Sequence, residues 1–222
     1  MAITDTFRID LPDNWHEVPI EPDDFRRHVL GIFDEAEWRS VPPVERRRVE
    51  LFVERVVADL RRADARFASV LLENVAESEA GAGDGGLVVA GVTVAIMSRE
   101  QLGSEVPLTA EVMHMAMSST DDRPKDETQS RTRTTNIEPP AIIELPVGRV
   151  VRLVRLMERG GPKDVSRFFT ETYLVPMPDD FERLLMVQFA TPQVEDARPY
   201  SDLFAAVART LHCYRVGEPT TL

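Results

Sequence analysis

The sequence is poor in residues that bind metals or form disulfides. Cys213 is the single cysteine of the 222 residues, so the chain can form neither an internal disulfide nor a cysteine metal cluster. We place Cys213 on the last predicted helix, as a small and partly buried residue. The four histidines, His16, His28, His114 and His212, lie far apart and form no recognisable zinc-ligand pair. The sequence therefore predicts no metal and no cofactor.

Long apolar runs are also missing. No segment approaches the roughly 20 apolar residues that a membrane-spanning helix needs. The first residues, MAITDTFRIDLPDNW, have neither the basic start nor the apolar run of a signal peptide. The formal net charge of −12 opposes binding to nucleic acids and to anionic lipid surfaces. We therefore expect a cytoplasmic protein that binds neither nucleic acid nor membrane.

The common catalytic motifs are missing as well. The sequence has no GxSxG, HExxH or Walker pattern and no GxGxxG after a strand. The glycine-rich segment 78–86, SEAGAGDGG, precedes a predicted strand and lacks a Lys-Ser/Thr pair, so we interpret it as a hairpin loop. The acid pairs Asp121/Asp122 and Asp179/Asp180 lie in turn-like contexts. We predict that the chain is not an enzyme, although a carboxylate pair assembled in space, as in glycosidases, stays open.

Two long amphipathic helices are predicted. In the segment of about 44–62, and again after Pro199, apolar residues recur at i, i+3, i+4, i+7, i+8 and i+11. Shorter helices are predicted over about 22–33 and 107–117. The apolar stripes are Val49, Phe52, Val53, Val56, Val57 and Leu60; Tyr200, Leu203, Phe204, Val207, Ala208 and Leu211; Phe25, Val29 and Phe33; and Leu108, Val112, Met115 and Ala116. Each helix must bury its stripe against another layer.

Strand patterns alternate with hairpin signals along the rest of the chain. Residues 4–11 alternate as a half-exposed edge strand would, and a strand, turn and strand are predicted within 165–189. The predicted strands 87–99 and 149–158 are apolar on both faces, which requires cover on both sides. Hairpin connections make neighbouring strands antiparallel. The sequence predicts an α/β (α+β) fold with one domain, 1–222: a mostly antiparallel sheet of about six to eight strands covered by helices on both faces, an α/β/α sandwich.

The candidate binding residues are charged. Residues 118–135 contain almost no apolar side chain and are predicted to form a surface loop, and residues 217–222 a frayed tail. Because Arg152 and Arg155 differ in strand parity, we expect an arginine strip around them to be divided between the two faces of the sheet. The candidate partner-binding residues are Arg131, Arg133, Arg149, Arg152, Arg155, Asp121 and Asp122.

Two segments resemble a known family. Residues 7–15, FRIDLPDNW, and the C-terminal part, YLVPMPDDFERLLMVQFATP followed by LFAAVARTLH, are similar to actinobacterial proteins of the PsbP-like superfamily, which includes lipoproteins of the LpqN type. The resemblance implies an α/β/α sandwich used as an adaptor or assembly factor, with no shared active site. This sequence has no lipobox cysteine near its first residue, which argues against a lipoprotein.

Together these observations predict a non-catalytic cytoplasmic interaction protein, an adaptor or accessory factor with a protein partner. The alternative is a module that binds a small molecule or lipid, or an enzyme with an unrecognised site between sheet and helix. A closed, fully packed sheet–helix interface would exclude that alternative.

Overall fold

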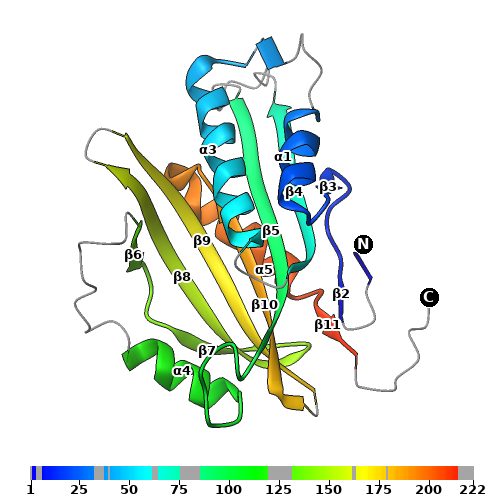
Figure 1. The fold of residues 1–222 in the computed structure, drawn as a ribbon, viewed down its shortest axis with the longest axis vertical. Coiled ribbons are helices and arrows are strands. Elements are labelled where there is room, and N and C mark those ends of the chain that lie inside the picture. Colours follow the sequence, from blue (N-terminus) through cyan, green and yellow to red (C-terminus); the bar gives the residue numbers. More distant parts are fainter. Residues whose placement is uncertain are drawn as a thin grey trace.

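An eight-stranded antiparallel sheet forms the centre of the molecule (Figure 1). The computed structural model describes residues 2–3, 7–32, 38–39, 41–61, 65–75, 86–119, 132–161, 164–178 and 180–214. The strand order is β3-β4-β5-β10-β9-β8-β6, and β7 also pairs with β8. The strands are β3 (Trp15–Glu17), β4 (Ala65–Val75), β5 (Gly86–Ser98), β6 (Thr132–Asn136), β7 (Ala141–Leu145), β8 (Gly148–Gly161), β9 (Asp164–Met177) and β10 (Asp180–Thr191).

The predicted C-terminal hairpin is present and is longer than the sequence pattern indicated. β9 and β10 pair over most of their length, with Leu174 opposite Met186. The register shifts between Asp180 and Leu184, and the Oδ1 atom of Asp180 accepts a hydrogen bond from the backbone N–H of Glu182 at 3.1 Å. Asp180 thus stabilises the turn, as its sequence context predicted.

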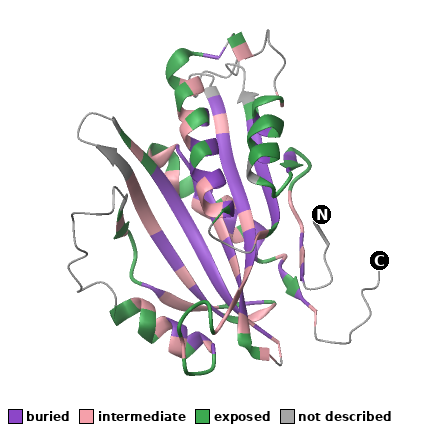
Figure 2. Cartoon of the chain, viewed as in Figure 1, coloured by how far each residue is buried: buried purple, intermediate pink, exposed green. Residues whose placement is uncertain are grey.

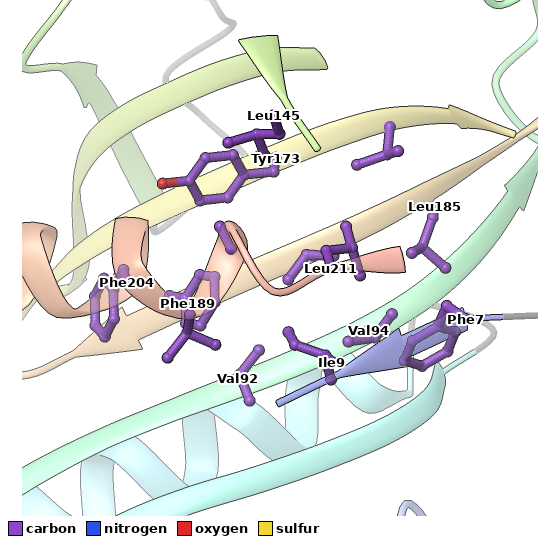
Figure 3. Close-up of a cluster of buried hydrophobic side chains, with 14 of the residues drawn as sticks. Phe7, Ile9, Val92, Val94, Leu145, Tyr173, Leu185, Phe189, Phe204 and Leu211 are labelled. Carbon is purple, nitrogen blue, oxygen red and sulfur yellow. The ribbon is translucent and has the colours of Figure 1, made fainter. Parts of the chain in front are cut away.

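One face of the sheet is covered by helix α5 (Ala197–Ala208) and by a small sheet with β2 (Phe7–Ile9) between β1 (Ala2–Ile3) and β11 (His212–Cys213). Phe204 of α5 is fully buried. Its ring stacks on Phe189 of β10 with 4.8 Å between the ring centroids. Figure 3 shows how Phe7 and Ile9 of β2 and Leu211, just before β11, join the same cluster. This layer therefore brings together both ends of the described chain.

The opposite face is covered by helices α1 (Pro22–Leu30), α3 (Pro43–Leu60) and α4 (Ala110–Ser119). The buried side of α3 packs on the β4–β5 region, and Figure 2 shows buried residues along these strands and the inward side of the helix. A β-carbon on Gly91 of β5 would lie 2.7 Å from Cζ of Phe52, so only glycine lets α3 pack this closely. With helices on both faces, the predicted α/β/α sandwich is confirmed.

Several predicted elements differ from the structure. Residues 7–9 form the central strand of the small sheet rather than an edge strand. Cys213 lies on β11 rather than on the last helix, which ends at Ala208. The predicted loop 118–135 is shorter at both ends, because α4 extends to Ser119 and β6 begins at Thr132. In α4, Met113 is buried, whereas Met115, expected in the apolar stripe, is exposed.

Some predictions concern residues outside the described ranges. These include most of the glycine-rich connector, the central part of the predicted surface loop and the predicted C-terminal tail. Among the described helices, none has the length and hydropathy needed to cross a membrane.

Candidate binding site beneath helix α4

The predicted arginine strip is divided between the two faces of the sheet, as the strand parity indicated. Arg152 faces the α5 side and bonds to Glu171 and Glu138. Arg149 forms an ion pair with Glu111 of α4, on the opposite side. Arg155 also lies on the α4 side, where it lines a pocket. Arg133 is exposed on β6. The remaining candidates, Arg131, Asp121 and Asp122, lie outside the described residues.

A buried polar network ties α5 to β8 and β9. The carboxylate of Glu171 is fully buried. Its Oε1 atom accepts hydrogen bonds from Nε of Arg152, at 2.7 Å, and from the hydroxyl of Tyr173. Its Oε2 atom accepts a hydrogen bond from the hydroxyl of Ser201, on α5, at 2.7 Å. Arg152 also donates to Glu138 at 2.7 Å. The network thus runs from the exposed Glu138 into the sheet–helix layer.

The electrostatics of this network favour fixed protonation states. Burial raises the pKa of the Tyr173 phenol, and the charge and hydrogen bond of Glu171 raise it further. Burial alone would lower the pKa of Arg152, but its hydrogen bond to Glu171 and the charges of Glu171 and Glu138 raise it above the ordinary value. A neutral phenol and a charged guanidinium therefore both persist at neutral pH. Both groups can therefore donate their hydrogen bonds to Glu171 at neutral pH.

A pocket of about 300 Å³ lies between α4 and the sheet. Four neighbouring strands, β5, β10, β9 and β8, form its floor, while α4 and the segment before it form its wall. Figure 1 shows α4 at the lower end of the sheet, beside β7. The lining residues are Met97, Leu102, Ser104, Leu108, Val112, Met113, Ala116, Met117, Leu153, Arg155, Thr172, Leu174, Leu184, Met186 and Gln188. The sheet–helix interface is therefore open at this place.

Contacts just before α4 and in its first half hold the helix over the sheet. Before the helix, the backbone N–H of Leu108 donates to the carbonyl oxygen of Phe181 at 2.9 Å. Within it, Glu111 pairs with Arg149 of β8, and Nε2 of His114 lies 3.0 Å from the carbonyl oxygen of Pro140. Ala116 faces the pocket with a single methyl group. These contacts fix the helix, and its small residue leaves space beneath it.

The polar groups of the pocket are few and are held in place. Nε of Arg155 donates to Oδ1 of Asn136 at 2.9 Å, and the guanidinium lies 3.9 Å from the sulfur of Met117. Nε2 of Gln188 donates to Oδ2 of Asp59 on α3 at 3.1 Å. Among the described residues that line the pocket, Arg155 is the only charged one. The described lining residues therefore combine an apolar wall with the positive charge of Arg155.

The pocket continues towards α3. A second hollow of about 140 Å³ shares Met97, Met186 and Gln188 with the first. Its far side is formed by α3, where Asp59 forms an ion pair with Arg55 at 2.7 Å. A wider hollow of about 700 Å³ lies beside α1, but exposed charged and histidine side chains such as Asp24, Arg27 and His28 line it, and it is open to solvent. The pocket beneath α4 is better enclosed and more apolar than this hollow beside α1.

Sequence reasoning kept a site between sheet and helix only as an alternative, and it identified neither the methionines of the pocket nor the buried acid. Met113 and Met117 are four residues apart and share one helix face, so both line the pocket, whereas Met115 is exposed. Met97 and Met186 come from strands more than 85 positions apart, and no local pattern joins them. Glu171 had a local signal, since it is an acid inside the otherwise uncharged strand segment FFTETYLV. A charge in such a segment indicates a buried partner.

Two further observations limit the chemistry of the described residues. Cys213 is buried on β11, and burial raises the pKa of its thiol to about 12. Within the described ranges, no three histidine, cysteine, aspartate or glutamate side chains lie together in a way that could hold a metal ion. The pocket beneath α4 is therefore the principal candidate for a functional site.

Comparison with known proteins gives a distant likeness. No protein-family model matches the sequence, and no curated protein is significantly similar to it. Among solved structures, the chain is similar to the crystal structure of LpqN, a protein involved in cell envelope biogenesis of Mycobacterium tuberculosis. The identity is 9%, the alignment covers 94% of this chain and 83% of LpqN, and the TM-score is 0.43. The two proteins thus share only a distant similarity of backbone structure.

Proposed function

We propose that this chain is a non-catalytic accessory protein that acts by binding, and that the pocket beneath α4 is its binding site. The observation that supports this proposal is the apolar pocket of about 300 Å³ between α4 and the sheet. Its volume and mostly apolar lining are typical of sites for small apolar ligands.

The charge of the lining supports binding rather than catalysis. General acid–base catalysis needs a group that gains and loses a proton near the working pH. Arg155, the single charged residue among the described lining residues, stays protonated at any physiological pH. A fixed charge can orient a ligand but cannot exchange protons with it.

The methionines that line the pocket indicate a site that can accept ligands of different shapes. Met97, Met113, Met117 and Met186 all contact the pocket. Methionine has an unbranched, polarisable side chain that adapts to different shapes, and it is frequent at surfaces that accept several ligands. We infer that the pocket adjusts to its occupant.

Family and location are further parts of the proposal. Membership of the PsbP-like superfamily is supported by the sequence of residues 7–15 and 173–192. We place the protein in the cytoplasm. Fractionation of the source cells, with the protein detected by antibody, tests this placement.

Binding of Nile red, a neutral apolar dye whose fluorescence rises in apolar surroundings, tests the pocket. Ala116 lies at the exposed mouth, so Ala116→Trp should fill the opening without disturbing the core. We expect saturable one-to-one binding to the unchanged protein and at least about tenfold weaker binding to Ala116→Trp, a difference of about 1.4 kcal/mol. The matched control is Ala206→Trp, at an exposed position of α5. Absence of saturable binding to the unchanged protein would contradict the proposal.

A protein partner is the second candidate, and a different observation favours it. Leu102, Val106 and Phe181 are 39%, 49% and 52% exposed beside the pocket. The segment that carries Leu102 and Val106 is joined to the β9–β10 turn, since the N–H of Leu108 donates to the carbonyl oxygen of Phe181. Exposed apolar groups that lie together are typical of interaction surfaces. The acidic side chains of Glu100 and Glu105 nearby favour an apolar partner segment with basic flanks.

Affinity capture from native lysate, with mass spectrometry of the bound material, tests the second candidate. We expect a stoichiometric protein with the unchanged chain and its loss with Phe181→Ser. Val44→Ser is the matched control, because Val44 is 67% exposed on α3 and is not part of this surface. Equal capture by both variants would exclude this surface as the binding site.

A further inference from the structure

We propose that the pocket beneath α4 binds an apolar ligand that carries an anionic group, and that Arg155 binds this group. The inference rests on the proposed binding function and adds the chemical class of the ligand. It is carried by the apolar lining of the pocket, by the position of Arg155 in it and by the contacts that hold the Arg155 guanidinium.

The floor of the pocket crosses four strands. It includes Met97 on β5, Met186 on β10, Leu174 on β9 and Arg155 on β8. These four strands are consecutive neighbours in the sheet, so the floor crosses three inter-strand spacings of roughly 4.8 Å each, or roughly 14 Å. Leu184 and Gln188 of β10 also line the pocket and lie four residues apart, which is roughly 13 Å along the strand. The floor is therefore about as broad along the strands as across them, and it offers a wide, mostly apolar surface to a ligand.

The charge lies at one side of this floor. Arg155 is on β8, the last of the four strands, and Met97 is on β5, at the other side. The described lining residues between them are uncharged, and Leu153, Leu174 and Leu184 are buried among them. A ligand that lies across the four strands therefore meets mostly apolar groups and a guanidinium at one side. This order matches an amphiphile with a single head group.

The guanidinium is oriented before any ligand binds. Asn136 on β6 accepts a hydrogen bond from Nε of Arg155 at 2.9 Å, and Met117 of α4 lies against the guanidinium. A guanidinium offers a planar set of N–H donors that suits carboxylate, sulfate or phosphate oxygens. In a pocket with apolar walls its attraction for an anion is less screened than in water. Cationic head groups are disfavoured there for the same reason.

The anionic group could belong to a free amphiphile or to a lipid in a membrane. The net charge of −12 repels anionic surfaces. We therefore expect the protein to take up the free, monomeric amphiphile and not to bind to vesicles.

Displacement of Nile red by four compounds with the same twelve-carbon chain tests the inference. The compounds are dodecanoate, dodecyl sulfate, dodecanol and dodecyltrimethylammonium, each below its critical micelle concentration. We expect the two anions to bind at least about tenfold more tightly than the alcohol, a difference of about 1.4 kcal/mol, and the cation to bind most weakly. Equal binding of dodecanoate and dodecanol would overturn the inference while leaving the pocket as a binding site.

Arg155→Gln tests the assigned residue. We expect the variant to lose the preference for anions and to keep its affinity for dodecanol, which also shows that the pocket is intact. Arg26→Gln, at an exposed position of α1 away from the pocket, is the control and should retain the preference. If Arg155→Gln keeps the preference, Arg155 does not bind the head group and the inference fails.

The same measurements separate the two proposals. If none of the four compounds displaces the dye and the dye itself does not bind, both the proposed function and the inference fail. Flotation with vesicles of phosphatidylglycerol tests the source of the anion. Co-flotation that Arg155→Gln abolishes would overturn the expectation of a free ligand, whereas protein that stays in solution and binds dodecanoate supports it.

Discussion

Nε of Arg152 lies 2.7 Å from Oε1 of Glu171, and this ion pair connects the surface of the sheet to the layer beneath α5. The side chain of Glu171 is fully buried, whereas that of Arg152 is 20% exposed. A second acid, Glu138, reaches the same guanidinium from outside and is 53% exposed. One arginine therefore has a buried and an exposed acid partner, and the two can be compared directly.

We expect Glu171→Gln to lower the free energy of unfolding by about 3 kcal/mol, because removal of one partner leaves a partly buried charge without full compensation. Chemical denaturation followed by circular dichroism measures the change. Glu138→Gln is the matched control and should cost less than about 1 kcal/mol, as is typical of exposed ion pairs. Similar costs for the two variants would show that the buried carboxylate has no special role.

Phe204→Ala should lower the free energy of unfolding by about 3–5 kcal/mol, as is typical when a buried aromatic ring is removed from a core. Phe204 is fully buried and stacks on Phe189, so its loss leaves a cavity between α5 and the sheet. Urea denaturation measures the effect, and Asp202→Ala, at an exposed position of α5, is the control. A change below about 1 kcal/mol would mean that α5 is peripheral to the fold.

Gly91→Ala should destabilise the protein by about 1–3 kcal/mol, because the added methyl group overlaps the ring of Phe52. Phe52→Leu shortens that side chain and should partly relieve the overlap. We therefore expect the double variant to be more stable than the sum of the single changes predicts, by at least about 0.5 kcal/mol. Additive effects in thermal or urea denaturation would show that the two residues do not compete for space.

Cys213 should not react with thiol reagents in the folded protein near pH 8. Burial raises the pKa of its thiol to about 12, whereas an exposed cysteine has a pKa of about 8.5, and only the thiolate reacts. Between about pH 8.5 and pH 12 the thiol loses its proton in the unfolded chain but not in the folded protein. The free energy of unfolding therefore falls as the pH rises through this range. Iodoacetamide labelling followed by mass spectrometry checks this. Reaction should occur in denaturant, and a Val44→Cys variant should react at its exposed site when folded.

The helices and hairpins could be predicted because their signals are local. The apolar stripe of α3 needs only residues within 11 positions of one another, and Val49, Phe52, Val53, Val56, Val57 and Leu60 are all buried. The strands that are apolar on both faces required cover on both sides, and β5 lies between α3 and the layer of α5. The sandwich follows from these two patterns together.

Other elements had no such signal. The sequence TRTTN of β6 contains no apolar residue, and it is a strand because it pairs with the edge of β8. The position of β2 depends on β11, which lies about 200 residues further along the chain. Cys213 is not helical, because α5 ends at Ala208 and the chain then returns to β2. Pairing between distant segments decided these elements.

The candidate site depends on the tertiary structure in the same way. That Arg152 and Arg155 lie on opposite faces of the sheet could be predicted from strand parity, since side chains alternate along any strand. The pocket could not be predicted, because its lining comes from four strands, one helix and the segment before that helix. The spacing of apolar residues determines which face of α4 turns inward. Only packing of the complete chain decides that this face covers the sheet incompletely and leaves a hollow with Arg155 at one side.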